Sequence, residues 1–454
     1  MTDHEFDIVV IGMGPGGEHV ADQLASAGLL VAGVEARLVG GECPYWGCVP
    51  SKMMIRAADL LTEGRRIPGM AGASVVSPNW APVATRIRAE ATDNWDDTVA
   101  ADRLAEAGGT LFRGFGRITA PGEVTVGADV LRARRGIVIN TGTSPAIPPV
   151  PGLADTPFWT NREIIESESV PQSLVVLGGG AIGTELAQVF ARFGAQVNVV
   201  EALDHLLPMD EPECGELIAK IFAAEGITVT TGVRAQLVSH DGTSGFTVTL
   251  SDGSQVRGDR LLVATGRATD LAGLGVDAIG LDPGARWIAT DDQMRAAPGV
   301  WAIGDVVGHG AFTHMSMYHA GIVIDEILGR PHHPAEYHAV PRVTFTDPEI
   351  GSVGLTEAAA RSQLDAVSTG LSQLPASPRG WIHKAGNSGF IKLVADSDRG
   401  VLVGATSAGP MGGEVLSMLT LAVHAAVPVQ RLAEMIYAYP TFHRAVADAL
   451  SQLG

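Results

Sequence analysis

The chain has 454 residues, enough for about three domains, and its abundant glycine with sparse aromatics is typical of α/β proteins with buried parallel strands. Its formal net charge of −19 argues against a general nucleic-acid partner, because phosphate binding needs concentrated Lys and Arg. No apolar run approaches the ~18 residues of a membrane span, and a strand begins too early to leave room for a signal peptide, so a cytoplasmic location is expected.

The first predicted elements form a dinucleotide-binding pattern. Residues 6–11 predict a buried strand, residues 18–27 a helix, and residues 29–34 a second strand that ends at Glu35. Glycines between the first strand and the helix let backbone N–H groups approach a pyrophosphate, while the acidic residue binds a ribose hydroxyl. The residues expected at this site are Gly12, Gly14, Pro15, Gly17 and Glu35.

Two of the three cysteines, Cys43 and Cys48, come next, directly before an apolar run over residues 53–61 with helical spacing. A helix N-terminus stabilises a thiolate, and two neighbouring thiols can close and reopen a disulfide. Lys52 would share a helix face with Cys48. The alternatives are buried structural cysteines or half of a zinc site, but zinc needs further paired ligands and Cys214 stands alone. A redox dithiol is therefore favoured, and no metal site is expected.

The dinucleotide pattern then repeats. Residues 174–177 predict a strand, residues 184–193 a helix, and residues 196–200 a strand that ends at Glu201. A shift of 166 residues places the first set of glycines and Glu35 on Gly178, Gly180, Gly183 and Glu201. We expect FAD in the first site, which contains the dithiol, and a nicotinamide nucleotide in the second. NAD is favoured over NADP, because Glu201 would repel a 2′-phosphate and residues 202–207 include no arginine.

The remaining elements complete an α/β fold with two Rossmann-like dinucleotide-binding domains and an α+β C-terminal domain. Short strands are predicted within residues 110–126, and strand-and-turn segments at 136–143, 261–267 and 300–305, the last ending at Asp305. Strands at 342–345, 390–394 and 401–405 and a helix at 414–426 form the tail. The predicted division is 1–146 for the first part of the FAD domain, 147–268 for the NAD domain, 269–336 for the second FAD part and 337–454 for the tail.

Several motifs together resemble the class I pyridine nucleotide-disulfide oxidoreductases, the family of dihydrolipoamide dehydrogenase, glutathione reductase and mercuric reductase. They are GMGPGG, GGECPYWGCVPSK, NTGTSP, GGGAIGTE, ATGR, AIGD and VTFTDPEIGSVGLTE. The resemblance implies a homodimer joined through the tail domain. It also implies hydride transfer from NADH to flavin, and electron transfer from flavin through a Cys43–Cys48 disulfide to a small-molecule acceptor.

The resemblance also implies roles for individual residues. Cys48 would be the charge-transfer thiol against the flavin, Cys43 the interchange thiol, and Lys52 with Glu185 the ion pair beside flavin N5. Further FAD contacts would come from Glu35, Gly41, Gly116, Thr141, Gly142, Asp305 and Thr313. The NAD path would be lined by Ile182, Glu201, Val233, Gly266 and Arg267.

The C-terminal segment departs from the family pattern. Tyr439 takes the place of the usual histidine base, and Arg444 that of its glutamate partner. Phenol titrates near pH ~10 and imidazole near ~6.5, so Tyr439 is a poor general base. His443, about one helical turn after Tyr439, is weighed as a substitute base against a solvated or capping histidine. Glu42, where a hydroxyl usually faces the FAD phosphates, is expected to turn to solvent.

The leading function is NADH-dependent reduction of a disulfide-type acceptor. The alternatives are a quinone, dye or metal-ion reductase of the diaphorase or mercuric-reductase kind, and a true dihydrolipoyl dehydrogenase. The histidines and methionines of residues 313–319 are expected to pack in the core or beside FAD, not to bind a metal.

Overall fold

A computed structural model describes residues 2–243 and 245–453. It divides into two compact units: unit 1 comprises residues 1–51, 85–146 and 267–336, and unit 2 comprises residues 52–84, 147–266 and 337–454. Residues 52–84, predicted with the FAD domain, group with unit 2, because the later turns of their helix are ion-paired to other parts of unit 2. The four-part domain division stays a prediction.

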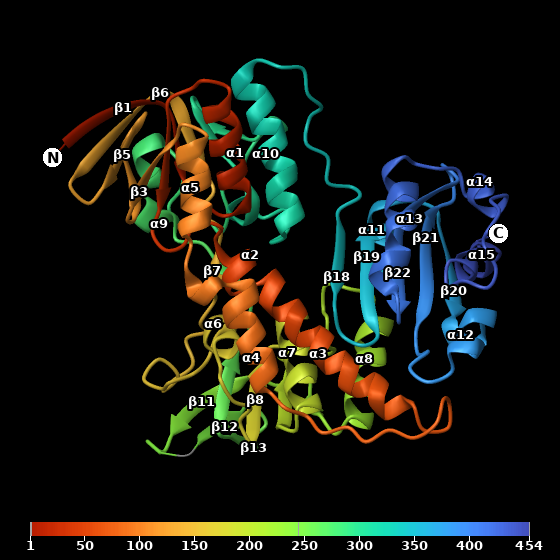
Figure 1. Cartoon of the computed structure of the whole chain (residues 1–454). Helices are drawn as coiled ribbons and strands as arrows, with labels where there is room; N and C mark the ends of the chain where they lie inside the picture. The colour runs from red at the N-terminus through yellow and green to blue at the C-terminus, as the bar shows by residue number, and fades with distance from the viewer. Residues whose placement is uncertain (1, 244, 454) are drawn as a thin grey trace. The chain divides into compact units, whose positions relative to one another are not determined.

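Unit 1 is built on one eight-stranded sheet (Figure 1). Its central strand contains Ile8, Val9, Val10 and Ile11, all buried, as expected for a strand covered on both faces. The order is β16-β17-β6-β1-β2-β3, with β5 pairing to β6 and β4 to β5. The strands are β1 (Thr2–Ile11), β2 (Val31–Glu35), β3 (Thr110–Arg113), β4 (Gly116–Ala120), β5 (Glu123–Val126), β6 (Asp129–Ile139), β16 (Arg295–Ala297) and β17 (Val300–Ala302).

Helices α1 and α10 pack against each other in this unit, as Figure 1 shows. A two-stranded ribbon of β7 and β15 adds to it. The elements are α1 (Pro15–Ser26), α2 (Glu42–Tyr45), α5 (Thr98–Glu106), β7 (Ser144–Pro145), β15 (Arg267–Ala268), α9 (Leu271–Leu274) and α10 (Thr313–Leu328). Helices α3 (Cys48–Arg66) and α4 (Ala81–Arg86) each run from one unit into the other.

Unit 2 contains a parallel sheet of order β10-β9-β8-β14 and an antiparallel sheet β11-β12-β13. The parallel strands bury Val175, Val176, Val199 and Leu262. The strands are β8 (Ser173–Leu177), β9 (Gln196–Val200), β10 (Thr228–Thr230), β11 (Ala235–His240), β12 (Phe246–Leu250), β13 (Gln255–Gly258) and β14 (Arg260–Val263). The helices are α6 (Asn161–Ile165), α7 (Ala181–Arg192) and α8 (Pro212–Ala224).

The C-terminal part of unit 2 is an antiparallel sheet of order β18-β19-β22-β21-β20, as the alternating tail segments predict. Helix α13 packs on β19 and β22, and α15 on β20 and β21. The strands are β18 (Pro341–Thr344), β19 (Glu349–Gly354), β20 (Val367–Gln373), β21 (Phe390–Asp396) and β22 (Val401–Gly409). The helices are α11 (Glu357–Gln363), α12 (Pro378–His383), α13 (Gly412–His424), α14 (Val429–Ala433) and α15 (Arg444–Leu450).

The sequence repeat is also a structural repeat. Ile8 pairs with Val31 in β1–β2, and Leu174 pairs with Val197 in β8–β9, a register shifted by the same 166 residues. A Cβ added at Gly17 would lie 2.0 Å from the Gly12 carbonyl oxygen, and one added at Gly183 would lie 1.9 Å from that of Gly178. Only glycine allows the helix to approach the turn this closely in either copy.

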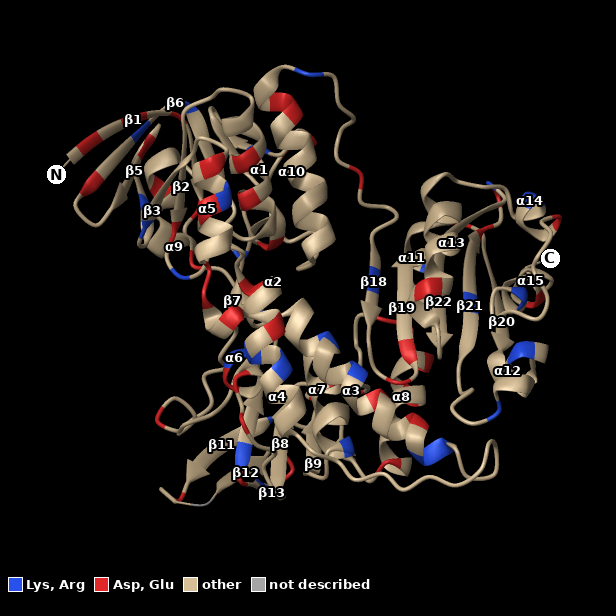
Figure 2. Ribbon diagram, viewed as in Figure 1, with Lys and Arg blue, Asp and Glu red and all other residues tan. Residues whose placement is uncertain are grey.

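Most differences from the predicted elements lie at boundaries. Helices α1 and α7 begin three residues earlier than predicted, at Pro15 and Ala181, because each begins immediately after a glycine of the turn. Strand β6 begins at Asp129, well before the predicted residue 136, because its first half pairs with β5. Among the described residues, no helix is long and apolar enough to cross a membrane. Acidic residues outnumber basic ones along the fold (Figure 2), in line with 50 against 31 in the sequence.

Candidate active site

The first dinucleotide fingerprint ends at Glu35, the last residue of β2. Its Oε2 accepts a hydrogen bond from the Met13 N–H at 2.8 Å and its Oε1 one from the Arg37 N–H at 2.7 Å. Burial raises the pKa of Glu35, although both backbone bonds act against that shift. Helix α1 begins after Gly14 with no side chain bonded to its first N–H groups. This end of the helix has the donors that a phosphate requires.

The second fingerprint repeats this geometry in unit 2. Glu201 Oε2 accepts from the Gly179 N–H at 2.6 Å and Oε1 from the Leu203 N–H at 2.8 Å. These donors are the counterparts of Met13 and Arg37 at the same shift along the chain. Helix α7 also begins without a side-chain cap, and a Cβ added at Gly180 would meet nothing within 4 Å. Both fingerprints therefore fit a dinucleotide by the chemistry of their donors and acidic residues.

Two glycines of the predicted FAD site lie at close approaches within unit 1, and a third has a left-handed backbone conformation. A Cβ on Gly41 would lie 2.8 Å from the Gly14 Cα, and one on Gly116 would lie 2.9 Å from a Val34 methyl group. Gly142 has a φ of +64°, a conformation that favours glycine. It follows Thr141, whose Cα would lie 2.9 Å from a Cβ on Gly12.

Asp305 belongs to a polar cluster in unit 1. Its Oδ2 accepts a hydrogen bond from Thr143 Oγ1 at 2.9 Å, and burial raises its pKa. Arg267 Nε donates to the same Thr143 oxygen at 2.6 Å, and Arg267 Nη2 lies 3.3 Å from Glu42 Oε2. The expectation that Glu42 turns to solvent is therefore wrong, because Arg267 offers it a charged partner. Arg267 itself, expected on the NAD path, contacts residues of unit 1.

The two cysteines lie at successive helix starts, Cys43 in α2 and Cys48 as the first residue of α3. Both are thiols, hydrogen-bonded to each other. That bond, and secondly burial, raises the pKa of Cys43. Cys48 Sγ lies 3.4 Å from the hydroxyl oxygen of Thr313, the first residue of α10. Cys48 thus lies at the positive ends of two helices, which favours a thiolate there while Cys43 keeps its proton.

Lys52 is one turn beyond Cys48 on α3, and its ammonium lies 2.9 Å from Glu185 Oε2. The other carboxylate oxygen, Oε1, accepts the N–H of Phe345 at 2.8 Å. Lys52 Nζ also lies 4.8 Å from the centre of the Phe345 ring. Glu185 is only 5% exposed, whereas the Lys52 side chain is 36% exposed, so the carboxylate is shielded from water and the ammonium is partly solvated.

The three candidate residues of the C-terminal segment, Tyr439, His443 and Arg444, do not lie on one helix. Tyr439 is 72% exposed in a turn, and α15 begins only at Arg444, with His443 directly before it. The expected helical turn between Tyr439 and His443 is therefore absent, since Pro440 interrupts the segment. Arg444 Nη1 pairs with Asp448 Oδ1 at 3.1 Å along α15.

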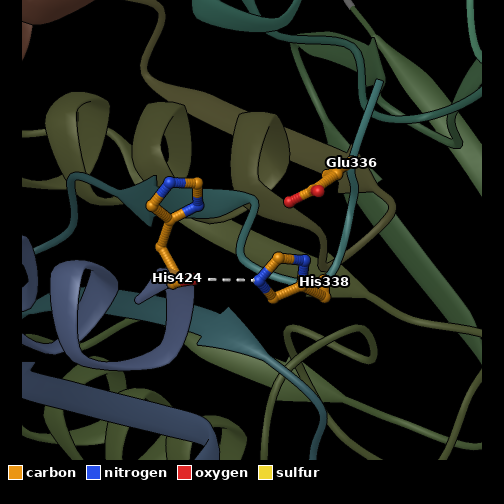
Figure 3. Close-up of side chains that lie close together, drawn as sticks. All are labelled: Glu336, His338 and His424. Atoms are coloured by element: carbon orange, nitrogen blue, oxygen red, sulfur yellow. Dashed lines mark hydrogen bonds between the residues drawn. The ribbon is translucent and has the colours of Figure 1, made fainter. Parts of the chain in front are cut away.

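Other cysteines and histidines lie elsewhere. Cys214 is buried inside α8, and its pKa is raised by burial and then by Asp210, so a thiolate is unfavourable there. His319 is buried in α10, accepts the Gly304 N–H at 3.2 Å and has a pKa lowered to about 4 by burial. His338 and His424 stack with ring centres 5.8 Å apart (Figure 3). These two rings and the Glu336 carboxylate, all exposed, could each offer one ligand atom, which is fewer than the four ligands of a structural zinc site, and the absence of a metal stays a prediction.

Comparisons with known proteins agree with this geometry. Residues 6–321 match the family described as pyridine nucleotide-disulphide oxidoreductase, and residues 340–450 match its dimerisation domain. The chain belongs to this family. It is accordingly an FAD-dependent pyridine nucleotide-disulfide oxidoreductase whose redox pair is Cys43–Cys48, and its tail is a dimerisation domain.

The relatives include more than one kind of enzyme. The chain is 34% identical to a dihydrolipoyl dehydrogenase of Chlorobaculum tepidum, over 99% of this chain and 98% of that protein. It is also 34% identical to a mercuric reductase of Acidithiobacillus ferrooxidans, over 96% of this chain and 80% of that protein.

Solved structures with the same fold include LpdA from Mycobacterium tuberculosis, with a TM-score of 0.86 and 25% identity over 100% of both chains. They also include a Cu(II) complex of the HOCl-induced flavoprotein disulfide reductase RclA from Escherichia coli. That structure has a TM-score of 0.87 and 25% identity, over 99% of this chain and 100% of RclA.

The sequence did not lead us to Phe345, whose N–H donates to Glu185, or to Asp347, which contacts Gln188 and Arg192 of the same helix. Phe345 and Asp347 belong to the VTFTDPEIGSVGLTE motif. This motif contributed to the family resemblance, but the resemblance implied no role for its individual residues. A signal was present in α7, where Glu185, Gln188 and Arg192 follow helical spacing on an otherwise apolar helix.

Proposed function

We propose that the protein is an NADH-dependent reductase that passes electrons through Cys43–Cys48 to a disulfide-type acceptor. The observation that carries the proposal is the pair of free thiols, Cys43 in α2 and Cys48 at the start of α3, with Thr313 of α10 at 3.4 Å from Cys48. When bound, FAD supplies acceptance of hydride from the nicotinamide and delivery of electrons to the disulfide. The chain's own residues position the cofactors and manage the sulfur chemistry.

The first fingerprint would hold FAD. Gly12, Gly14, Pro15 and Gly17 would present the N-terminus of α1 to the pyrophosphate, and Glu35 would bind the ribose. Gly41, Gly116, Thr141, Gly142, Asp305 and Thr313 would complete the FAD site. The Glu35 carboxylate oriented by two backbone N–H groups, and the buried Asp305 carboxylate, are acceptors that sugar hydroxyls would fit.

The second fingerprint would hold NADH. Gly178, Gly180, Ile182 and Gly183 would receive the pyrophosphate, and Glu201 would accept a 2′-hydroxyl while repelling a 2′-phosphate. Val233 and Gly266 would lie along the nucleotide, and Val233 donates its N–H to the Glu201 carbonyl oxygen at 3.3 Å. Anaerobic bleaching of the flavin by NADH and by NADPH compares the two directly. A clear preference for NADPH would contradict the role proposed for Glu201.

Cys43 would exchange with the acceptor and Cys48 would face the flavin. The Cys43 sulfur would attack one sulfur of the acceptor disulfide as the Cys43 proton, held by a raised pKa, passes to the other, leaving acceptor sulfur. The Cys48 thiolate, stabilised by two helix N-termini, would then attack Cys43 in this mixed disulfide, release the second acceptor sulfur as a thiolate and close the Cys43–Cys48 disulfide. Lys52 would place its positive charge beside the flavin, held there by Glu185.

The acceptor differs from lipoamide in this proposal, because Tyr439 and Arg444 would replace the proton-transferring dyad. An exposed phenol and a permanently charged guanidinium suit an acceptor that develops negative charge better than a thiol that must exchange protons. The His443 side chain remains a candidate base that the proposal does not require. The enzyme would act as a cytoplasmic homodimer through the matched dimerisation domain.

A metal-ion or quinone reductase is the second candidate. The same loss of the dyad favours acceptors that need no proton from the C-terminal segment, and relatives include mercuric reductases and a Cu(II)-bound RclA. In this case electrons would leave from the flavin or the dithiol without disulfide exchange at Cys43.

A Cys43→Ser variant distinguishes these two functions. We expect it to accept hydride from NADH at the wild-type rate and to lose turnover with small disulfides by at least about a hundredfold. Quinone turnover measured in parallel is the control for an intact flavin site. If the wild-type enzyme reduces no disulfide, and quinone turnover in Cys43→Ser equals that of wild type, the disulfide reductase proposal is wrong.

A further inference from the structure

Helix α7 carries three buried polar side chains along one face. Glu185, Gln188 and Arg192 are spaced by three and four residues and are 5%, 3% and 4% exposed. Burying a charge is costly unless ion pairs or hydrogen bonds compensate it, and burying an amide is costly without hydrogen bonds. The neighbours of this face must therefore supply a partner at each of the three positions.

The segment between β18 and β19 is the common partner. The Phe345 N–H donates to Glu185 Oε1 at 2.8 Å, and the Asp347 N–H donates to Gln188 Oε1 at 2.8 Å. Gln188 Nε2 donates back to the Asp347 carbonyl oxygen at 3.0 Å. One turn further on, Arg192 Nη2 lies 2.8 Å from the Asp347 carboxylate. The helix thus holds this segment at three successive points.

Helix α3 makes a second set of contacts with the same face. Lys52 pairs with Glu185 at 2.9 Å, and Asp59, seven residues later, pairs with Arg192 at 2.7 Å. The spacing between the two α3 residues equals the spacing between their α7 partners. Two ion pairs of opposite polarity, two turns apart, fix the register of α3 against α7.

Arg192 joins these two sets of contacts. Its guanidinium binds carboxylates from three places: Asp59, Asp347 and, at 2.7 Å, Glu225, which directly follows α8. We call Arg192, Asp59, Glu225 and Asp347 the Arg192 cluster. Arg66 contacts Asp347 as well, at 2.7 Å. Its planar guanidinium offers donors in fixed directions, and Nε, Nη1 and Nη2 each donate to a different carboxylate, of Glu225, Asp59 and Asp347.

We propose that Arg192 is a positioning residue for the Lys52–Glu185 pair. The two oxygens of Glu185 are divided between the Phe345 N–H and Lys52, so the place of the Lys52 ammonium depends on where the 345–347 segment and α3 lie. The Arg192 cluster fixes both. This inference rests on the proposed function, in which the Lys52 charge lies beside the flavin.

The test is a conservative exchange of cations in two matched clusters. Arg192→Lys keeps the charge but loses the planar set of donors. The control is Lys392→Arg, in a buried cluster where Lys392 Nζ contacts Glu211, Glu213 and Glu357 at 3.0, 2.7 and 3.0 Å. Both exchanges disturb a cation among three carboxylates, but only Arg192 belongs to the face that holds Glu185.

The readouts are the midpoint potential of the bound flavin, the rate of its reduction by NADH and the thermal midpoint of unfolding. We expect Arg192→Lys to lower the flavin potential, because a displaced Lys52 no longer stabilises the reduced, negatively charged flavin. Reduction by NADH should slow by about tenfold with little change in NADH affinity. Lys392→Arg should lower thermal stability and leave the potential and the rate unchanged.

A second variant covers the case in which Arg192→Lys fails to fold. Gln188→Leu removes two hydrogen bonds to Asp347 and one, at 3.3 Å, to Glu225 Oε1 without changing any charge, and it should change the potential and the rate in the same direction. If a folded Arg192→Lys or Gln188→Leu loses stability while the potential and the rate match wild type, the positioning role is wrong. Failure of the proposed function would differ, since NADH would then not reduce the flavin of the wild-type enzyme.

Discussion

At the scale of single residues, the reduced dithiol is asymmetric. Cys48 begins α3 and lies 3.4 Å from Thr313 at the start of α10, whereas the pKa of Cys43 is raised by Cys48 and by burial. One sulfur is thus placed to carry negative charge and the other to carry the proton. This division of roles follows from position along the helices and not from the cysteines themselves.

Asp59 is the residue at which the Arg192 cluster responds to pH. Burial raises its pKa to about 6, with Arg192 and Arg56 acting against the shift and Asp347 adding to it. The folded protein binds the Asp59 proton more tightly than the unfolded chain does. Protonated Asp59 therefore stabilises the folded state, and this stabilisation is fully present below the pKa of Asp59 in the unfolded chain. It is lost as the pH rises from about 4 to about 6.

We therefore expect Asp59→Asn, which resembles the protonated residue, to gain stability relative to wild type as the pH rises. The gain between about pH 4 and about pH 7 should be on the order of 1 kcal/mol after allowance for solvent screening. Urea unfolding of both proteins at the two pH values measures it.

Glu357→Gln provides a control of opposite sign. The pKa of Glu357 is lowered, first by its hydrogen bond to Lys392, so its stabilisation is present above the unfolded pKa and is lost as the pH falls. This variant should lose stability relative to wild type as the pH rises. A stability difference for Asp59→Asn that stays constant, or shrinks, with rising pH would contradict the account of the Arg192 cluster.

At the scale of elements, the segment before α15 is the part of the chain that we propose differs from the family pattern. Tyr439 is exposed in its turn, and Arg444 is ion-paired to Asp448 within α15. The structure therefore gives Arg444 a local partner of its own. An ion pair at this i,i+4 spacing stabilises a helix modestly.

Restoring the dyad tests what this segment does. Tyr439→His with Arg444→Glu should raise the rate of lipoamide reduction by about tenfold or more, because an imidazole with a carboxylate partner can transfer the proton at neutral pH. Tyr439→His alone should give a smaller gain. The new glutamate would stand one turn before Asp448, at a cost of about 0.5 kcal/mol, so thermal unfolding is measured alongside. An unchanged lipoamide rate in a stable double variant would mean that pocket shape excludes this substrate.

Sequence reasoning succeeded for elements with a strong local signal. The two strand–glycine–helix units were predicted because glycine spacing and the acidic residue after the second strand are local features, and the structure repeats them with the same register. Helix α3, which begins at Cys48, was predicted from the helical spacing of its apolar residues. Helix starts were missed by three residues, because a helix that follows a glycine turn can begin with residues that carry no apolar signal.

Contacts between distant parts of the sequence were not predictable in the same way. Glu42 finds Arg267, 225 residues away, and Asp59 finds Arg192, 133 residues away. Residue type and local spacing do not predict such a partner, because the sequence does not distinguish an exposed carboxylate from a buried, ion-paired one. The expectation for Glu42 failed for this reason.

At the scale of the whole molecule, the central claim is that one flavin and one dithiol act in series. The residues that we propose for these sites are spread along the chain, from Gly12 to Asp305 and Thr313. A protein that bound flavin but had no redox dithiol would accept only one electron pair from NADH per flavin. Counting electrons therefore tests the whole arrangement at once.

The most direct measurement is an anaerobic titration of the oxidised holoenzyme with NADH, followed by the visible spectrum. We predict that wild type takes up about two equivalents of NADH per flavin before the flavin is fully bleached, and that Cys43→Ser takes up about one. The first equivalent in wild type should produce a long-wavelength band from the Cys48 thiolate against the flavin. Bleaching of wild type by a single equivalent, with no such band, would contradict the account.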